Sequence, residues 1–179
     1  MTHPAFGSGL RIQQPVKHKV FISYHHGGDQ AYYEAFSKAF HDSYDVIYDN
    51  SLERQVDSDN VDYVIRRIRE NYIAGSSCTI ALVGKDTWGR KYVDWEIMAT
   101  LEKEHGLIGV YLPSAPRSAE NKITVPDRLH DNIKSGFALW RSWEQITVNT
   151  RSLQQNIAEA KTRNPQLIVN TRERRLRNA

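Results

Sequence analysis

The sequence predicts a single α/β domain in which helices cover both faces of a central parallel sheet of about five strands. Short β-branched and aromatic runs alternate along the chain with segments whose apolar residues recur at helical spacing. The 179 residues suffice for one well-buried core and are too few for two ordinary domains. Residues 78–84 are apolar almost throughout, as expected of a central strand that is buried on both faces.

The first half of the chain supplies two strands and two helices. A strand is expected at residues 19–23, followed by a helix at about residues 29–42 and a short strand at residues 44–48. The clearest helix of the sequence begins near residue 58 and ends at Gly75. Its apolar stripe consists of Val61, Val64, Ile65, Ile68 and Tyr72.

The second half continues the alternation. The expected elements are the strand at 78–84, a helix at about 92–105, a strand at 107–112, a long polar connection at 113–134, a strand near 137–141 and a final helix at about 151–162. Strands that alternate with helices predict a parallel sheet. Ligands of such sheets bind beyond the carboxyl ends of the strands, so this edge is where chemistry is expected.

Composition bounds the class of protein. No apolar run approaches the ~18 residues needed to cross a bilayer, and the first residues do not read as a signal peptide. The single cysteine, Cys78, excludes an internal disulfide and a cysteine-based zinc site. We therefore expect a cytoplasmic protein.

Charge is distributed unevenly along the chain. The net charge is +3, but the last 19 residues carry six basic groups and one acidic group. We divide the chain into a flexible leader (residues 1–16), a folded domain (17–165) and a basic tail (166–179). A basic tail can attract nucleic acid, yet the simpler expectation is a solvated, partly frayed terminus.

Polar and aromatic side chains gather where the predicted strands end. The candidates are Ser23, Tyr24 and His25 after the first strand, Asp49 after the second, and Trp88, Trp95 and Glu96 after the third. Glu96 is the most informative, because a carboxylate in the opening turn of a helix is held ionised by the helix dipole. Beside an aromatic wall, such a carboxylate suits sugar hydroxyls and an oxocarbenium-like transition state. The alternative is that Glu96 rests in solvent.

Each other candidate also has a structural alternative. The pair His25–His26 does not predict a metal site, since adjacent residues of a turn point apart and no further ligands accompany them. Asp49 most often would cap its own loop, and packing is the commoner role of a tryptophan such as Trp88 or Trp95. Gly27 and Gly28 would allow a ligand to approach the backbone closely, or would form a plain turn.

The same residues resemble a known family. Residues 20–24 followed by Asp29 look like the opening motif of TIR domains, and residues 77–84 with Trp88 and residues 95–97 are similar to the third TIR strand and its glutamate-bearing helix. The resemblance is greatest to the TIR-like proteins of bacterial Thoeris anti-phage defence, and it covers roughly residues 19–112.

The resemblance implies a flavodoxin-like TIR-type fold of three layers that binds NAD as its substrate and cleaves the nicotinamide–ribose bond. It places the catalytic glutamate at Glu96, with Tyr24, His25 and Asp49 as further pocket residues. The product would be an ADP-ribose-derived signal, of the cyclic type or a conjugate, that activates a separate effector protein. Self-assembly and a phage-derived activator are expected partners. The Arg-Asp…Pro-Gly loop of adaptor TIR domains is absent, since residues 49–54 read Asp-Asn-Ser-Leu-Glu-Arg.

Other functions compete with this one. A TIR-like module that only binds other proteins is the main alternative. A phosphorylation receiver needs acidic residues directly after the first strand, where this chain has Ser23 to His26. A flavin carrier needs a phosphate-binding turn at the same place. A nucleic-acid-binding function would depend on the basic tail alone.

Overall fold

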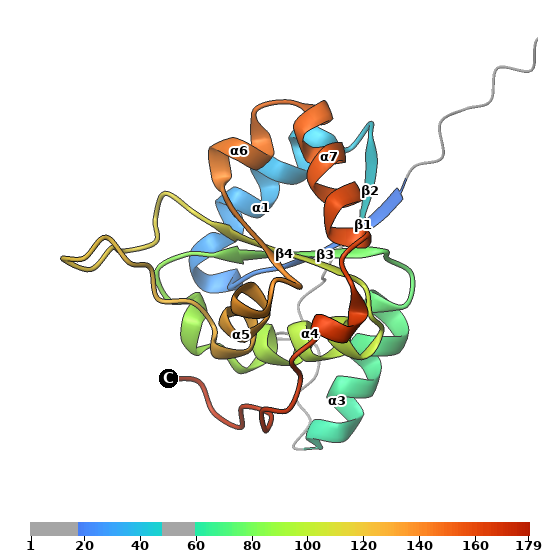
Figure 1. Cartoon of the computed structure of the whole chain (residues 1–179), viewed down its shortest axis with the longest axis vertical. Helices are drawn as coiled ribbons and strands as arrows, with labels where there is room; N and C mark the ends of the chain where they lie inside the picture. Colours follow the sequence, from blue (N-terminus) through green and yellow to red (C-terminus); the bar gives the residue numbers. More distant parts are fainter. Residues whose placement is uncertain (1–17, 48–59) are drawn as a thin grey trace, which may run out of the picture.

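The computed structural model describes residues 18–47 and 60–179. The expected leader and Asp49 lie outside the described residues. Within the described part of the chain, five parallel strands form one sheet in the order β2-β1-β3-β4-β5 (Figure 1). This confirms the predicted α/β class and its central parallel sheet.

The strands are β1 (His18–Ser23), β2 (Tyr44–Ile47), β3 (Cys78–Val83), β4 (Gly106–Tyr111) and β5 (Leu139–Ser142). β3 lies in the middle of the sheet, where Cys78 is in register with Val20 of β1 and Gly106 of β4. All six residues of β3 are buried. A strand covered on both faces explains the continuous apolar run in the sequence.

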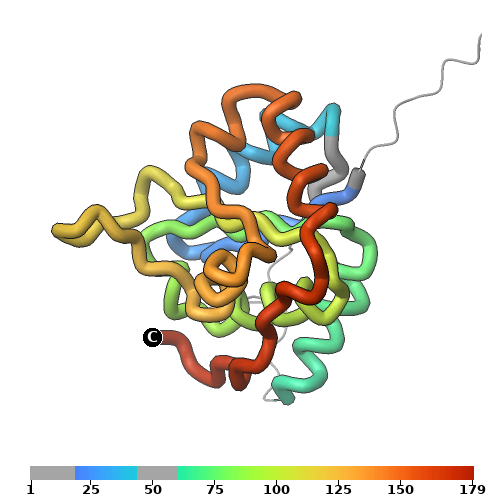
Figure 2. The backbone as a smooth tube through the Cα atoms, viewed as in Figure 1, coloured from blue at the N-terminus to red at the C-terminus, as the bar shows by residue number. Residues whose placement is uncertain are grey.

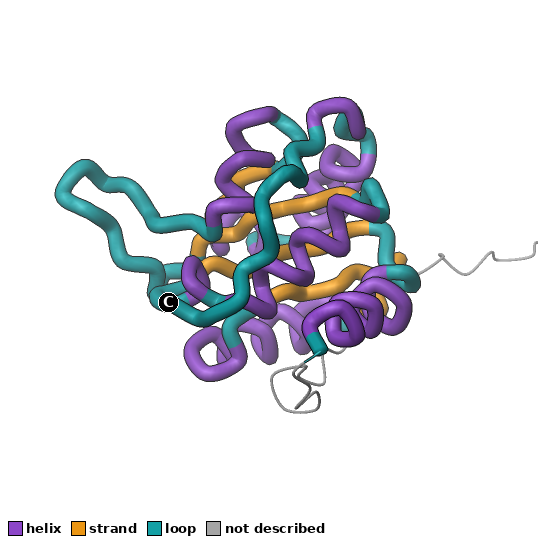
Figure 3. The backbone as a smooth tube through the Cα atoms, turned by 90° about the horizontal axis from the view of Figure 1, so that it is seen from below, coloured by secondary structure: helices purple, strands orange, loops and turns teal. Residues whose placement is uncertain are grey.

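Helices cover both faces of the sheet (Figures 1 and 3). One face carries α1 (His26–Phe40), α6 (Trp143–Thr147) and α7 (Thr150–Lys161), and the other carries α3 (Val61–Arg67), α4 (Lys91–Glu102) and α5 (Asp127–Ser135). Because side chains alternate along a strand, Ile22 of β1 packs under α1 while Phe21 packs under α4. No described helix is long and apolar enough to span a bilayer.

Helix α1 begins earlier than expected. It starts at His26, three residues before the predicted start, with His25 as its N-cap. Gly27 and Gly28, expected before the helix either as a plain turn or as a place where a ligand approaches the backbone, therefore lie in its first turn. The prediction was late because two glycines are poor helix formers and are typical of turns.

Two α-helices within the described residues were not predicted. α5 lies at the end of the segment read as a polar connection, and its buried residues are Arg128, Leu129 and Asn132. Two of these three are polar, so the helix has no apolar stripe of ordinary width. α6 directly follows β5 and is only five residues long, and it begins with a capping box between Ser142 and Gln145.

The basic tail lies against α4 and α5 (Figure 2), so it is not the frayed terminus that was expected, although most of its residues remain exposed to solvent. The indole Nε1 of Trp95 donates a hydrogen bond of 2.8 Å to the carbonyl oxygen of Arg175. The backbone N–H of Arg175 donates to the carboxylate of Asp94 at 3.0 Å. At the end of the tail, the N–H of Ala179 donates to the carbonyl oxygen of Gly89 at 2.9 Å.

Three arginines of the tail form ion pairs with acidic residues of the domain. Arg172 forms an ion pair with Asp131 of α5, and Arg174 forms one with Asp62 of α3. Arg175 pairs with Asp127 at 3.5 Å. The positive charge of the tail is therefore partly neutralised by the domain on which it lies.

Candidate functional site

The carboxyl ends of β1 and β3 bring together two of the predicted site residues, Ser23 and Glu96. Ser23 is the last residue of β1, and Glu96 projects from α4, which follows β3 and its loop. The hydroxyl Oγ of Ser23 donates a hydrogen bond of 2.5 Å to Oε2 of Glu96. Both residues are buried, and Glu96 is 2% exposed. The carboxylate therefore lies inside the domain, which excludes the alternative of a solvated side chain.

Glu96 does not lie in the opening turn of its helix. α4 begins at Lys91, so Glu96 is the sixth residue of the helix and Asp94 is the acidic residue of the first turn. The field of a helix end falls off within about one turn. The helix dipole thus acts on Asp94, whereas the carboxylate of Glu96 accepts a hydrogen bond from Ser23.

A pair of buried threonines fixes the backbone at Glu96. Oγ1 of Thr100 donates to the carbonyl oxygen of Glu96 at 2.8 Å, and the hydroxyls of Thr79 and Thr100 are 2.7 Å apart. Since a hydroxyl has one proton, Thr79 must donate in the second bond. This chain of hydrogen bonds ties α4, near Glu96, to the beginning of β3.

A second buried carboxylate, Asp29, lies at the same edge of the sheet. Oγ1 of Thr87 donates to Oδ2 of Asp29 at 2.7 Å and accepts the N–H of Gly84 at 2.8 Å. A Cβ at position 84 would come within 1.9 Å of Asp29 Oδ1, so this contact requires glycine. Burial raises the pKa of Asp29, and the hydrogen bond from Thr87 and the charge of His25 oppose that rise.

Sequence reasoning noted Asp29 only as part of a motif and assigned Thr87 no role. The two residues are 58 positions apart, and no periodic pattern connects them. A usable signal was the position of each, since Asp29 follows β1 and Thr87 follows β3, two strands that are neighbours in the sheet.

Tyr24 points to the other face of the sheet from Ser23. Its ring stacks on Tyr33 of α1, with centroids 4.5 Å apart and an interplanar angle of 10°. Its hydroxyl donates to Oε1 of Gln30 at 2.9 Å and lies 3.3 Å from Nδ1 of His26. Tyr24 thus belongs to the core under α1, and the structure does not bring it to the carboxylate of Glu96.

His25 is half-buried at the start of α1, and its ring lies close to Gly27 and Gly28. Its backbone carbonyl accepts the backbone N–H of Asp29 at 2.8 Å, at the start of α1. Among residues 18–47 and 60–179, no three His, Cys, Asp or Glu side chains are grouped so that they could hold a metal ion.

The two tryptophans near Glu96 have different environments. Trp88, in the short 3-10 helix η2 (Thr87–Gly89), is 40% exposed and remains available to a ligand. Trp95 is 2% exposed, packs edge-on against Tyr92 and donates to the basic tail. Successive residues of a helix point about 100° apart, so Trp95 turns towards the tail where Glu96 turns towards β1. Trp95 has the packing role that was its structural alternative.

The sheet order, with a buried carboxylate between β1 and α4, defines a flavodoxin-like α/β domain of the TIR-like class. The family model described as Thoeris protein ThsB, TIR-like domain, matches residues 21–117, and the chain belongs to this family. The match begins within β1, includes β3, β4 and all the predicted site residues, and ends before α5 and the basic tail. Membership supports a role in Thoeris defence. No curated protein matches the chain.

Proposed function

We propose that the protein cleaves NAD, releases nicotinamide and makes an ADP-ribose-derived signal of the cyclic type that activates a partner effector in Thoeris defence. One observation carries the proposal. The carboxylate of Glu96 is buried at the ligand-binding edge of a parallel sheet and is oriented by the hydroxyl of Ser23. Membership of a TIR-like family supports the same assignment.

The chemistry requires a negative charge beside the nicotinamide ribose. When the bond between ribose C1′ and the pyridinium nitrogen breaks, its electron pair leaves with nicotinamide, which becomes neutral. The positive charge that was on the pyridinium ring is then carried by C1′ and the ring oxygen of the ribose. Glu96 would bind the ribose hydroxyls and stabilise this charge. A hydroxyl of the same molecule, another acceptor or water then attacks C1′ and loses its proton.

Substrate can contact Glu96 only if the surrounding groups move, because the residue is 2% exposed. The proposed catalytic cycle therefore begins with a local opening at the ends of β1 and β3. An enzyme closed in this way fits the expectation that self-assembly or a phage-derived activator switches the activity on.

The test is nicotinamide release from NAD by the purified full chain, alone and with extract of phage-infected host cells, with products identified by mass spectrometry. Glu96→Gln keeps the shape of the side chain and removes its charge. We expect it to lower turnover by a factor of about 10³ or more, the usual scale for losing a charge-stabilising group. Glu102→Gln is the matched control, since Glu102 lies in the same helix and is paired with Arg69 near the surface.

The competing function is a TIR-like module that binds partners without catalysis. The near-complete burial of Glu96 favours it, because a buried carboxylate bonded to Ser23 can have a purely structural role. This module would release no nicotinamide under any of the conditions above. Equal turnover of the Glu96→Gln and Glu102→Gln variants would also argue against Glu96 as the catalytic residue.

A further inference from the structure

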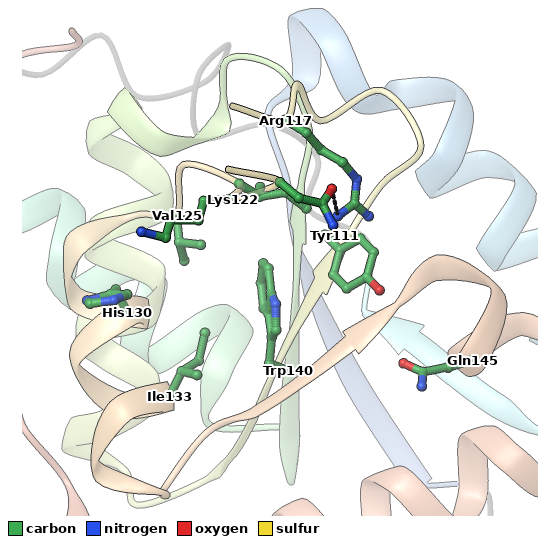
Figure 4. Close-up of a pocket in the computed structure, with 10 residues that line it drawn as sticks. Tyr111, Arg117, Lys122, Val125, His130, Ile133, Trp140 and Gln145 are labelled. Carbon is green, nitrogen blue, oxygen red and sulfur yellow. Dashed lines mark hydrogen bonds between the residues drawn. The ribbon is translucent and has the colours of Figure 1, made fainter. Parts of the chain in front are cut away.

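A pocket of 560 Å³ lies beyond the carboxyl ends of β4 and β5, at the sheet edge remote from β1 (Figure 4). Its volume is within the ~300–1,000 Å³ typical of small-molecule sites. Its lining consists of Tyr111, Arg117, Asn121, Lys122, Ile123, Val125, His130, Ile133, Trp140 and Gln145. Much of this lining comes from residues 113–134, the segment whose role the sequence did not explain.

The polar part of the pocket is cationic. Its positive charges are those of Arg117 and Lys122, and none of the ten lining residues is acidic. Lys122 shares its charge with Glu120, whose carboxylate is 2.5 Å from its Nζ. Arg117 has no carboxylate partner within the described part of the chain, and it donates to the amide oxygen of Asn121 at 3.1 Å. A guanidinium that has no carboxylate partner is suited to bind a phosphate or carboxylate group of a ligand.

The loop that carries Arg117 is ordered by its own hydrogen bonds. Arg117 forms a β-bridge with Ile123, and the N–H of Ser118 donates to the carbonyl oxygen of Lys122 at 2.9 Å. Asn121 adopts a positive φ of 61°, which closes the turn. The guanidinium is therefore held over the pocket before any ligand binds, which lowers the entropic cost of binding.

The remaining wall is aromatic and aliphatic. The rings of Tyr111 and Trp140 are 5.3 Å apart, and the guanidinium of Arg117 lies 5.2 Å from the centre of the Tyr111 ring. In Figure 4, Trp140 stands between Tyr111 on one side and Val125, His130 and Ile133 on the other. Both aromatic side chains are half-buried. A flat ring in the pocket would stack on one face of the Trp140 indole, whose other face already packs against neighbouring side chains.

From the cations and the aromatic wall together we propose that this pocket binds a mononucleotide, with the phosphate on Arg117 and the base against Trp140. The site is separate from Glu96. β5 and β1 are separated in the sheet by β4 and β3, which at ~4.8 Å per strand places them about 14 Å apart. The inference does not depend on NAD cleavage, so the two proposals can fail independently.

The test is isothermal titration calorimetry of the full chain with AMP, adenosine, ribose 5-phosphate and inorganic phosphate. We expect AMP to bind at least about ten-fold more tightly than any of the three fragments, because only AMP has both a phosphate for Arg117 and a base for Trp140. Arg117→Gln should weaken AMP binding by about ten-fold or more, the scale of losing one hydrogen bond to a charged group. Trp140→Phe should weaken AMP binding and leave ribose 5-phosphate binding unchanged.

Matched variants decide between this pocket and other sites. Arg151→Gln removes an exposed arginine of α7 and should leave AMP binding unchanged. Glu96→Gln should also leave it unchanged. The proposal is overturned if millimolar AMP gives no binding heat, if Arg117→Gln binds AMP like the unaltered chain, or if phosphate alone binds as tightly as AMP. Arg117 is in a surface loop, so its variant is expected to fold, and circular dichroism checks this.

Discussion

Ser23 donates a short hydrogen bond to the carboxylate of Glu96. The two side chains come from β1 and α4, and their hydrogen bond is the contact between them that the structure describes. We predict that Ser23→Ala lowers the free energy of unfolding by about 1–3 kcal/mol, because a buried carboxylate loses a donor. It should also reduce nicotinamide release mainly through kcat, since the carboxylate would lose a contact that orients it.

Urea unfolding and steady-state kinetics measure the two effects of Ser23→Ala. Ser37→Ala is the matched control, because Oγ of Ser37 is buried and bonds no atom within the described residues. Equal stability losses in both variants would show that the hydrogen bond to Glu96 contributes nothing measurable.

Asp29 gives a prediction about pH. Burial raises the pKa of this carboxyl above its ordinary value of 3.8. The folded state thus binds the proton more tightly than the unfolded state, and the resulting stability is fully present below pH 3.8 and is lost as pH rises through the raised pKa. As the pH rises through the raised pKa, the Asp29→Asn variant should become progressively more stable relative to the natural chain.

Urea midpoints measured across a pH series test the prediction for Asp29. Asp42→Asn is the control, since Asp42 is exposed and its removal should not change the relative stability in this way. A constant difference between Asp29→Asn and the natural chain at every pH would contradict the argument.

Among the helices and strands, the sequence predicted those whose buried residues recur at a regular spacing. β3 and α7 could be predicted because burial selects apolar residues at spacings of two or 3.6. α5 could not, since Arg128 and Asn132 occupy its buried face. Nor could the link between Asp29 and Thr87, which depends on how loops after two neighbouring strands meet. The ends of the predicted strands indicated where the candidate site residues lie. Which of their side chains bond one another could be learned only from the three-dimensional structure.

Arg128 makes α5 part of the core instead of a surface helix. Its guanidinium is fully buried and donates to both carboxylate oxygens of Asp94, at 2.9 and 3.3 Å. It also donates to Asn170 and to the carbonyl oxygens of Arg172 and Glu173 in the basic tail. One side chain therefore joins α4, α5 and the tail.

We predict that Arg128→Met lowers the free energy of unfolding by about 3–5 kcal/mol, because it leaves Asp94 as a buried charge without its ion-pair partner. Adding Asp94→Asn to this variant should recover part of the loss, since the unpaired charge is then removed. Chemical denaturation of both variants measures this, with Arg151→Met as an exposed control. No recovery in the double variant would mean that lost packing, not the unpaired charge, dominates.

At the scale of the whole molecule, the basic tail closes the face of the domain that carries α4. Its contacts to Trp95, Asp94 and Gly89 fall on the segment that leads to Glu96. The net charge of the tail does not predict these contacts, because they are made largely by backbone groups of the tail. A run of arginines looks like a solvated terminus until the acidic residues that face it, such as Asp131 and Asp62, are placed in space.

The single cysteine allows the contribution of the tail to be measured. Cys78 is fully buried in β3, and burial raises the pKa of its thiol to about 12, so labelling by a thiol reagent at pH 8 requires the domain to open. Deleting residues 172–179 removes the carbonyl acceptor of Trp95 and two of the acceptors of Arg128, and we expect a loss of about 2 kcal/mol or more in the free energy of unfolding. When reclosing is faster than labelling, this corresponds to labelling about 30-fold faster.

A variant with Arg174→Gln and Arg177→Gln removes two charges, keeps the backbone contacts and should label nearly as slowly as the natural chain. Unchanged labelling after the deletion would show that the tail adds nothing to the stability of the domain, and equal acceleration in both variants would assign the effect to charge.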